Sequence, residues 1–104
     1  IIKGVNVFPS QIEQVIGSFD ELTLNYNLLV GRVKDRDTFE LQVELAKGLE
    51  IDDIPFLENL RARVEHALRE MLGIGCKITF LGAGTLKRSE GKAIRIIDTR
   101  NFND

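Results

Sequence analysis

Hydrophobic side chains recur along the chain with two periods, and each change of period marks a new predicted element. Residues 1–8 are β-branched and apolar around a glycine, which predicts a short strand or an extended entry. Pro9 then opens a helix, because proline fits the first helical turn. The apolar residues of this helix share one face: Ile12, Val15, Ile16 and Phe19.

Alternation of apolar and polar residues follows in two neighbouring segments, which are joined by a polar turn at residues 34–37. In residues 24–33 one side carries Leu24, Tyr26, Leu28 and Val30. In residues 38–46 one side carries Phe39, Leu41, Val43 and Leu45, and the other Thr38, Glu40, Gln42 and Glu44. This pattern predicts a β-hairpin with one side facing solvent.

Helical spacing returns after Asp52 and Asp53, which are good N-cap residues. Pro55 falls in the predicted first turn, and Gly73 and Gly75 end the pattern. The apolar positions between these signals are Leu57, Leu60, Val64, Ala67, Leu68, Met71 and Leu72. A second amphipathic helix is therefore predicted.

Two further strands are predicted at residues 76–81 and 93–98, with a glycine-rich loop between them and a polar tail at residues 99–104. The element order is then β-α-β-β-α-β with an extra terminal piece. Two helices on one face of a mainly antiparallel sheet define an α+β, ferredoxin-like two-layer sandwich. We find no repeat or linker, so residues 1–104 are predicted to form a single domain.

Composition narrows the class of protein. The 104 residues, 43 % of them hydrophobic, are enough for a packed core. A net charge of −2 and a pI near 5.4 lack the excess of Lys and Arg that is typical of nucleic-acid binding. No apolar run is long enough to span a membrane, and no signal peptide is visible. The single cysteine, Cys76, cannot form an internal disulfide, so we expect a cytoplasmic protein.

Few side chains suggest catalysis or metal binding. His66 lies among charged residues of the second predicted helix and is expected to be solvated. Cys76 is expected to be a small core residue. One histidine and one cysteine cannot build a zinc site without many carboxylates, so no metal site is predicted.

The loop after residue 81 combines three glycines with the basic residues Lys87, Arg88, Lys92 and Arg95. It is not a Walker A loop, because six residues separate Gly84 from Gly91 and Ala93 stands where Ser or Thr must bind Mg²⁺. These residues fit two interpretations of the loop. It is either a solvated connection or a loop that aims Lys92 at an anion.

Two stretches together resemble one known family: GVNVFPSQIE at residues 4–13 and GTLKRSEGKAIRIID at residues 84–98. Both are similar to the C-terminal domain of the phenylacetate–coenzyme A ligase family, within the adenylate-forming superfamily. The resemblance implies the lid domain of an AMP-forming aryl-acid ligase of phenylacetate catabolism, inactive alone. It implies that an N-terminal domain of the same chain binds the aromatic acid, ATP and Mg²⁺. We expect neither a nucleic acid nor a membrane as a partner. A homodimer is compatible with the resemblance.

The resemblance also implies roles for individual residues. Lys92, beside Gly91, matches the catalytic lysine of the adenylation half-reaction. The segment Gly4, Val5 and Asn6 matches the motif that lines the pantetheine tunnel for coenzyme A. Lys3 could meet a phosphate of coenzyme A.

The first residues, Ile1 to Gly4, lack a Met and open inside an apolar run, which leads us to expect a piece of a larger protein. Removal of a tag would leave the same start. The alternative function is a free-standing ferredoxin-like module that binds a small molecule or regulates another protein. Such a module would need no partner domain and would give Lys92 no special role.

Overall fold

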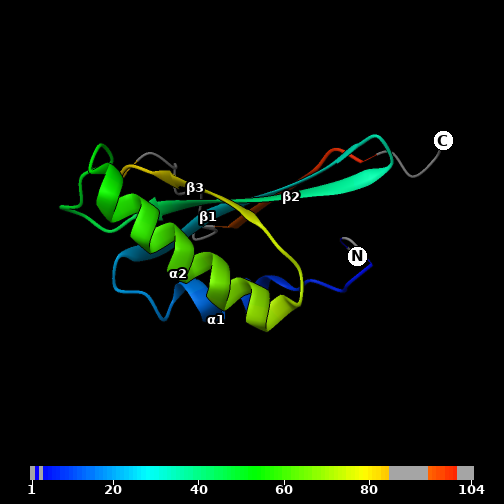
Figure 1. Cartoon of the computed structure of the whole chain (residues 1–104), viewed down its shortest axis with the longest axis horizontal. Helices are drawn as coiled ribbons and strands as arrows, with labels where there is room; N and C mark the ends of the chain where they lie inside the picture. The colour runs from blue at the N-terminus through cyan, green and yellow to red at the C-terminus, as the bar shows by residue number, and fades with distance from the viewer. Residues whose placement is uncertain (1, 3, 85–93, 101–104) are drawn as a thin grey trace.

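A four-stranded sheet with two helices on one face makes up the fold of the computed structural model (Figure 1). The structure describes residues 2, 4–84 and 94–100. In chain order the elements are α1 (Pro9–Ile16), β1 (Leu22–Val33), β2 (Arg36–Leu45), α2 (Ile54–Leu72), β3 (Lys77–Leu81) and β4 (Ile94–Asp98). The predicted α+β, two-layer class is confirmed.

The strands lie in the order β3-β2-β1-β4. β1 and β2 form the predicted antiparallel hairpin, but β3 pairs parallel to β2 and β4 pairs parallel to β1. The prediction of a mainly antiparallel sheet was therefore wrong. Since α2 carries the chain back along the sheet after β2, the next strand has to run in the same direction as β2.

In the predicted first strand, the described residues 2 and 4–8 do not join this sheet. Ile2 and Val5 bond to each other instead, with 2.7 Å from Ile2 N to Val5 O and 2.9 Å from Val5 N to Ile2 O. Gly4 reverses the chain between them at φ +77°, a conformation that favours glycine. The predicted element order is thus corrected to α-β-β-α-β-β, and the extra terminal piece is strand β4.

Helix α1 begins where proline predicted it. The Phe8 N–H donates to Gln11 Oε1 at 2.9 Å, which satisfies one backbone group left free at the helix start. Ile12, Val15 and Ile16 are buried as predicted. Phe19 lies beyond the end of the helix and is half-buried against the same core.

Helix α2 also has the predicted ends. The Phe56 N–H donates to Asp53 Oδ1 at 3.3 Å, and Gly73 ends the helix in the left-handed region at φ +80°. The face turned to the sheet buries Leu57, Leu60, Val64, Leu68 and Leu72. Burial of this apolar stripe fixes α2 against the sheet.

The start of β1 departs from simple alternation. Leu22 pairs with Leu45 and Tyr26 with Val43, so β1 carries extra residues between them and forms a bulge. Leu24 is consequently 51 % exposed, although the alternation predicted it on the apolar side. The Thr23 hydroxyl stabilises the bulge by donating to the Glu44 carbonyl at 3.2 Å.

The sheet face turned away from the helices is polar but largely paired. Glu44, predicted to face solvent, is only 3 % exposed and accepts from Asn25 Nδ2 at 3.3 Å. The same face carries side-chain bonds from Asn27 Nδ2 to Gln42 Oε1 at 3.3 Å and from Thr79 Oγ1 to Glu40 Oε2 at 2.7 Å. The predicted solvent-facing side is therefore wrong at Glu44, because the bulge brings Asn25 over its carboxylate.

Candidate functional site

The segment Gly4–Phe8 presents one accessible side. Gly4, Asn6 and Phe8 are exposed, whereas Val5 and Val7 are half-buried, and Val7 packs against the core. Among the described residues, no atom lies within 4 Å of the position that a Cβ on Gly4 would take. The backbone at Gly4 is thus open to close approach by another molecule.

Tyr26 connects the sheet to the end of this segment. Its side chain is fully buried, and its hydroxyl donates to Glu13 Oε2 at 3.0 Å and lies 3.5 Å from the carbonyl oxygen of Pro9. Burial, together with the Glu13 carboxylate, raises the pKa of the Tyr26 phenol above its ordinary value. The phenol therefore stays a neutral donor at physiological pH, and its contacts lie on helix α1, at Pro9 and Glu13.

The other predicted motif begins outside the described residues. Lys92 and Gly91 are not among them, and neither is Lys3. Strand β4 begins at Ile94, two positions after Lys92, and its first residue pairs with Tyr26. The two segments that the resemblance singles out are therefore both tied to Tyr26, one by a side chain and one by main-chain register.

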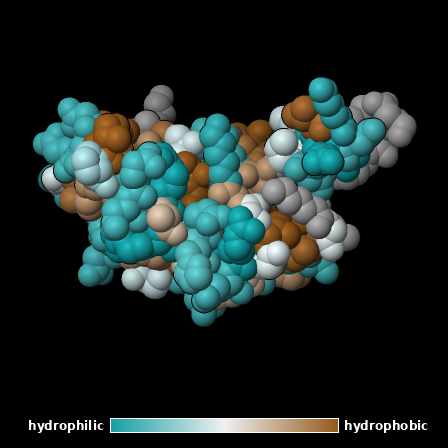
Figure 2. Space-filling view, in the orientation of Figure 1, coloured by the Kyte–Doolittle hydropathy of each residue, from teal (hydrophilic) through white to brown (hydrophobic). Residues whose placement is uncertain are grey.

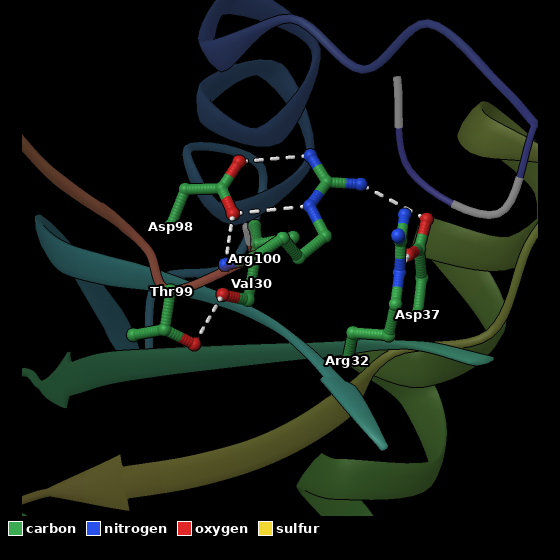
Figure 3. Close-up of polar contacts among 6 residues, drawn as sticks. All are labelled: Val30, Arg32, Asp37, Asp98, Thr99 and Arg100. Atoms are coloured by element: carbon green, nitrogen blue, oxygen red, sulfur yellow. Dashed lines mark hydrogen bonds and ion pairs between the residues drawn. The ribbon is translucent and has the colours of Figure 1, made fainter. Parts of the chain in front are cut away.

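The far end of β4 is held by a cluster of ion pairs (Figure 3). Arg100 Nη2 lies 2.8 Å from Asp98 Oδ2, and Arg100 Nη1 lies 2.9 Å from Asp37 Oδ2. Arg32 reaches the other Asp37 oxygen at 3.2 Å. The hydrogen bond from Arg100 holds the pKa of Asp98 below its ordinary value. The same bond to Asp98 raises the pKa of Arg100.

Thr99 adds a second connection at this end. Its N–H donates to the Val30 carbonyl at 2.8 Å, and its hydroxyl donates to the same oxygen at 3.2 Å. Thr99 and Arg100 belong to the predicted polar tail. They do lie beyond β4, and the structure adds that both are bonded to the β1–β2 hairpin.

A hollow of about 410 Å³ lies on the sheet face away from the helices, with Gly31, Thr38, Lys77 and Ile97 among its lining residues. Within the described part of the chain, no group of three or more His, Cys, Asp or Glu side chains could hold a metal ion. On the face shown in Figure 2, the described hydrophobic residues form small separate areas among hydrophilic ones. The hollow therefore carries no metal-binding chemistry of its own.

Two residues considered from the sequence have the expected surroundings. His66 is 71 % exposed, with its Nε2 3.0 Å from Glu70 Oε1, as predicted for a solvated helix face. Cys76 is buried, and its thiol donates to the Lys77 carbonyl at 3.3 Å. No helix in the described ranges is long and apolar enough to cross a membrane.

Sequence reasoning missed the polar contacts of Tyr26, Glu13, Asp37 and Arg100. Tyr26 was assigned to the apolar side of a strand, which is correct for its ring. A buried tyrosine nevertheless needs a partner for its hydroxyl, and this rule was a usable signal. Nothing local to Asp37 or Arg100 indicated their contact.

Comparison with known sequences gives the class of protein. The sequence pattern of the family described as the AMP-binding enzyme C-terminal domain matches residues 4–100. This chain belongs to that family.

The relatives are more specific. The chain is 39 % identical to the phenylacetate–coenzyme A ligase of Escherichia coli (strain K12) over 98 % of its own length and 23 % of the relative. It is 34 % identical to the phenylacetate–coenzyme A ligase of Thermus thermophilus, over 96 % of this chain and 25 % of that protein. The chain thus spans about a quarter of the length of the curated relatives that it matches.

Solved structures share the fold. A domain of phenylacetate–coenzyme A ligase from Bacteroides vulgatus superposes with a TM-score of 0.86 at 28 % identity, covering 98 % of this chain and 92 % of that one. A 2-hydroxyisobutyryl-CoA ligase, solved with 2-HIB-AMP and CoA in the thioesterification state, superposes with a TM-score of 0.85. Its identity is 23 %, over 96 % of this chain and 21 % of that one, so it supports the fold alone.

Proposed function

We propose that residues 1–104 form the C-terminal domain of a cytoplasmic, AMP-forming acid–coenzyme A ligase that acts on phenylacetate or a similar aromatic acid. The observation that carries the proposal is the 39 % identity to the Escherichia coli phenylacetate–coenzyme A ligase over 98 % of this chain. The remaining three quarters of such an enzyme would supply the N-terminal domain. In this proposal the isolated chain has no turnover.

Lys92 is the proposed catalytic residue of the adenylation half-reaction, in which the acid attacks the α-phosphate of ATP. Both reactants are anionic and repel each other. A lysine ammonium between them offsets this repulsion and the charge that develops at phosphorus. Gly91 leaves the backbone beside Lys92 unhindered.

Gly4, Val5 and Asn6 are the proposed contacts for the pantetheine arm of coenzyme A in the thioester half-reaction. The open space at Gly4 and the exposure of Asn6 support this role. Val5 lies between them, and its main-chain bonds to Ile2 hold the turn at Gly4 in place. Lys3 is the proposed partner of a coenzyme A phosphate.

ATP, Mg²⁺ and the acid are assigned to the N-terminal domain. The described residues of this chain offer no carboxylate group suited to Mg²⁺. In this proposal, what this chain contributes to adenylation is the positive charge of Lys92.

The test is Lys92→Ala in the full-length protein, with the two half-reactions measured separately. The rate of adenylate formation, measured by the release of pyrophosphate, should fall by about 100-fold or more, because a charge contact in the transition state is removed. Thioester formation from a supplied aryl-adenylate should stay within about twofold. Lys87→Ala, in the same loop, is the matched control and should spare both. Unchanged adenylate formation in Lys92→Ala would overturn the proposal.

The size of the native polypeptide gives a second test. An immunoblot of the source cells should show a chain several times heavier than the 11.7 kDa of this one. A native species of 11.7 kDa alone would contradict a single-chain ligase. A separate adenylating subunit, or the free-standing module, would then be the candidate.

A further inference from the structure

We propose that Tyr26 is a positioning residue for the coenzyme A step: its hydroxyl holds the start of α1, and through it the segment Gly4–Phe8, against the sheet. This inference rests on the proposed function, because it assumes that the segment meets coenzyme A. It assigns a role to a fully buried residue, which would act through this segment and not by contact with coenzyme A.

The segment needs support from its ends. Residues 6–8 belong to no helix or strand. At one end Ile2 and Val5 form their own turn, and at the other Phe8 leads directly into Pro9. Ile2 is buried in the core and Val7 packs against it, so these two side chains hold part of the segment. The position of the first turn of α1 then sets how Asn6 and Phe8 are presented.

Tyr26 is placed to fix the first two turns of α1, through Pro9 in the first and Glu13 in the second. The sheet holds its main chain on both sides, since it pairs with Val43 of β2 and with Ile94 of β4. Its ring is fully buried, and its hydroxyl reaches the carboxylate of Glu13 and the carbonyl of Pro9. A hydrogen bond from a phenol to a carboxylate is stronger than one between neutral groups.

Tyr26→Phe separates the effect of the hydroxyl's contacts with α1 from the effect of the ring's packing. Phenylalanine keeps the ring in the core and leaves the strand pairing intact, so only the hydroxyl is lost. In the full-length protein the KM for coenzyme A in the thioester half-reaction should rise about tenfold, the loss expected for a hydrogen bond to a charged group. Adenylate formation needs no coenzyme A and should stay within about twofold.

Thr79→Val is the matched control. It also removes one hydroxyl that donates to a glutamate carboxylate, Glu40, at 2.7 Å, but on β3 at the opposite edge of the sheet from β4. It should lower the melting temperature by an amount similar to Tyr26→Phe and leave the KM for coenzyme A unchanged. The comparison separates loss of position from loss of stability.

Glu13 variants test the same contact from the other partner. Glu13→Gln keeps an acceptor oxygen but loses the charge, so the KM for coenzyme A should rise less than in Tyr26→Phe. Glu13→Leu should reproduce the rise caused by Tyr26→Phe, and the double variant should show no additional rise. These variants also decide the matter if Tyr26→Phe folds poorly.

The inference is overturned if Tyr26→Phe behaves like Thr79→Val, or if it lowers both half-reactions equally. Lys92→Ala, assayed in parallel, distinguishes failure of the positioning role from failure of the proposed function. If Lys92→Ala abolishes adenylation while Tyr26→Phe has no effect on coenzyme A, the positioning role fails and the proposed function stands. If Lys92→Ala has no effect, the proposed function fails and this inference with it.

Discussion

Asp37 and Arg100 stand 63 residues apart in the sequence and form an ion pair, with 2.9 Å between Asp37 Oδ2 and Arg100 Nη1 (Figure 3). Their side chains are 12 % and 5 % exposed, so water screens the pair weakly. The pair joins the start of β2 to the chain just beyond β4. It thereby holds the strand that follows Lys92 against the hairpin.

Asp37→Asn should destabilise the folded chain. It removes a charge from a largely buried cluster and leaves Arg100 with Asp98 as its carboxylate partner. The free energy of unfolding, measured by urea denaturation, should fall by about 1–3 kcal/mol. Asp35→Asn makes the same charge change in the exposed turn nearby and should stay within about 0.5 kcal/mol. Equal effects of the two variants would contradict a structural role for the buried pair.

Acid should remove the contribution of Asp98. Its pKa is lowered in the folded state by the hydrogen bond from Arg100. Its stabilisation is therefore complete above the unfolded-state pKa of about 4 and is lost as pH falls through the lower folded-state value. The difference in unfolding free energy between the natural chain and Asp98→Asn should be constant near neutrality and shrink below about pH 4. A difference that does not change with pH would show that the charge is irrelevant.

The β1–β2 turn can be improved. Lys34 and Asp35 both have positive φ, +51° and +65°, which costs free energy in residues with a Cβ. Asn-Gly suits such a two-residue hairpin turn. Lys34→Asn combined with Asp35→Gly should therefore raise the free energy of unfolding by about 1 kcal/mol. A lower urea midpoint would mean that the turn is not the strained element that its dihedral angles indicate.

Gly4→Ala tests the coenzyme A segment with a close structural control. Gly4 and Gly48 both have positive φ, +77° and +94°, and neither has a described atom within 4 Å of an added Cβ. Both substitutions to Ala should cost about 1 kcal/mol of stability from backbone strain. Only Gly4→Ala should slow thioester formation in the full-length enzyme. The same loss of activity in both variants would point to strain alone.

Local signals predicted the local structure well. The ends of both helices were predicted from Pro9, Asp53 and Gly73. Each of these signals acts within a few residues of its own position, so the sequence was sufficient to predict both helices. Strict alternation likewise predicted the hairpin. The motif segments were found through family resemblance, and the role of Lys92 stays a prediction because that residue lies outside the described ranges.

Partners far apart in the sequence decided the rest. The parallel pairing of β4 with β1 depends on strands that meet only after folding. The bulge in β1 accounts for the burial of Glu44 under Asn25 and for the exposure of Leu24. A backbone or side-chain group bonds to whatever the tertiary structure brings within reach, and no local pattern records this. The sequence by itself thus determined the helices, the hairpin and the family. Only the tertiary structure decided the order of the strands and the contacts of Tyr26 and Arg100, because those contacts form between residues whose spacing in the sequence carries no periodic signal.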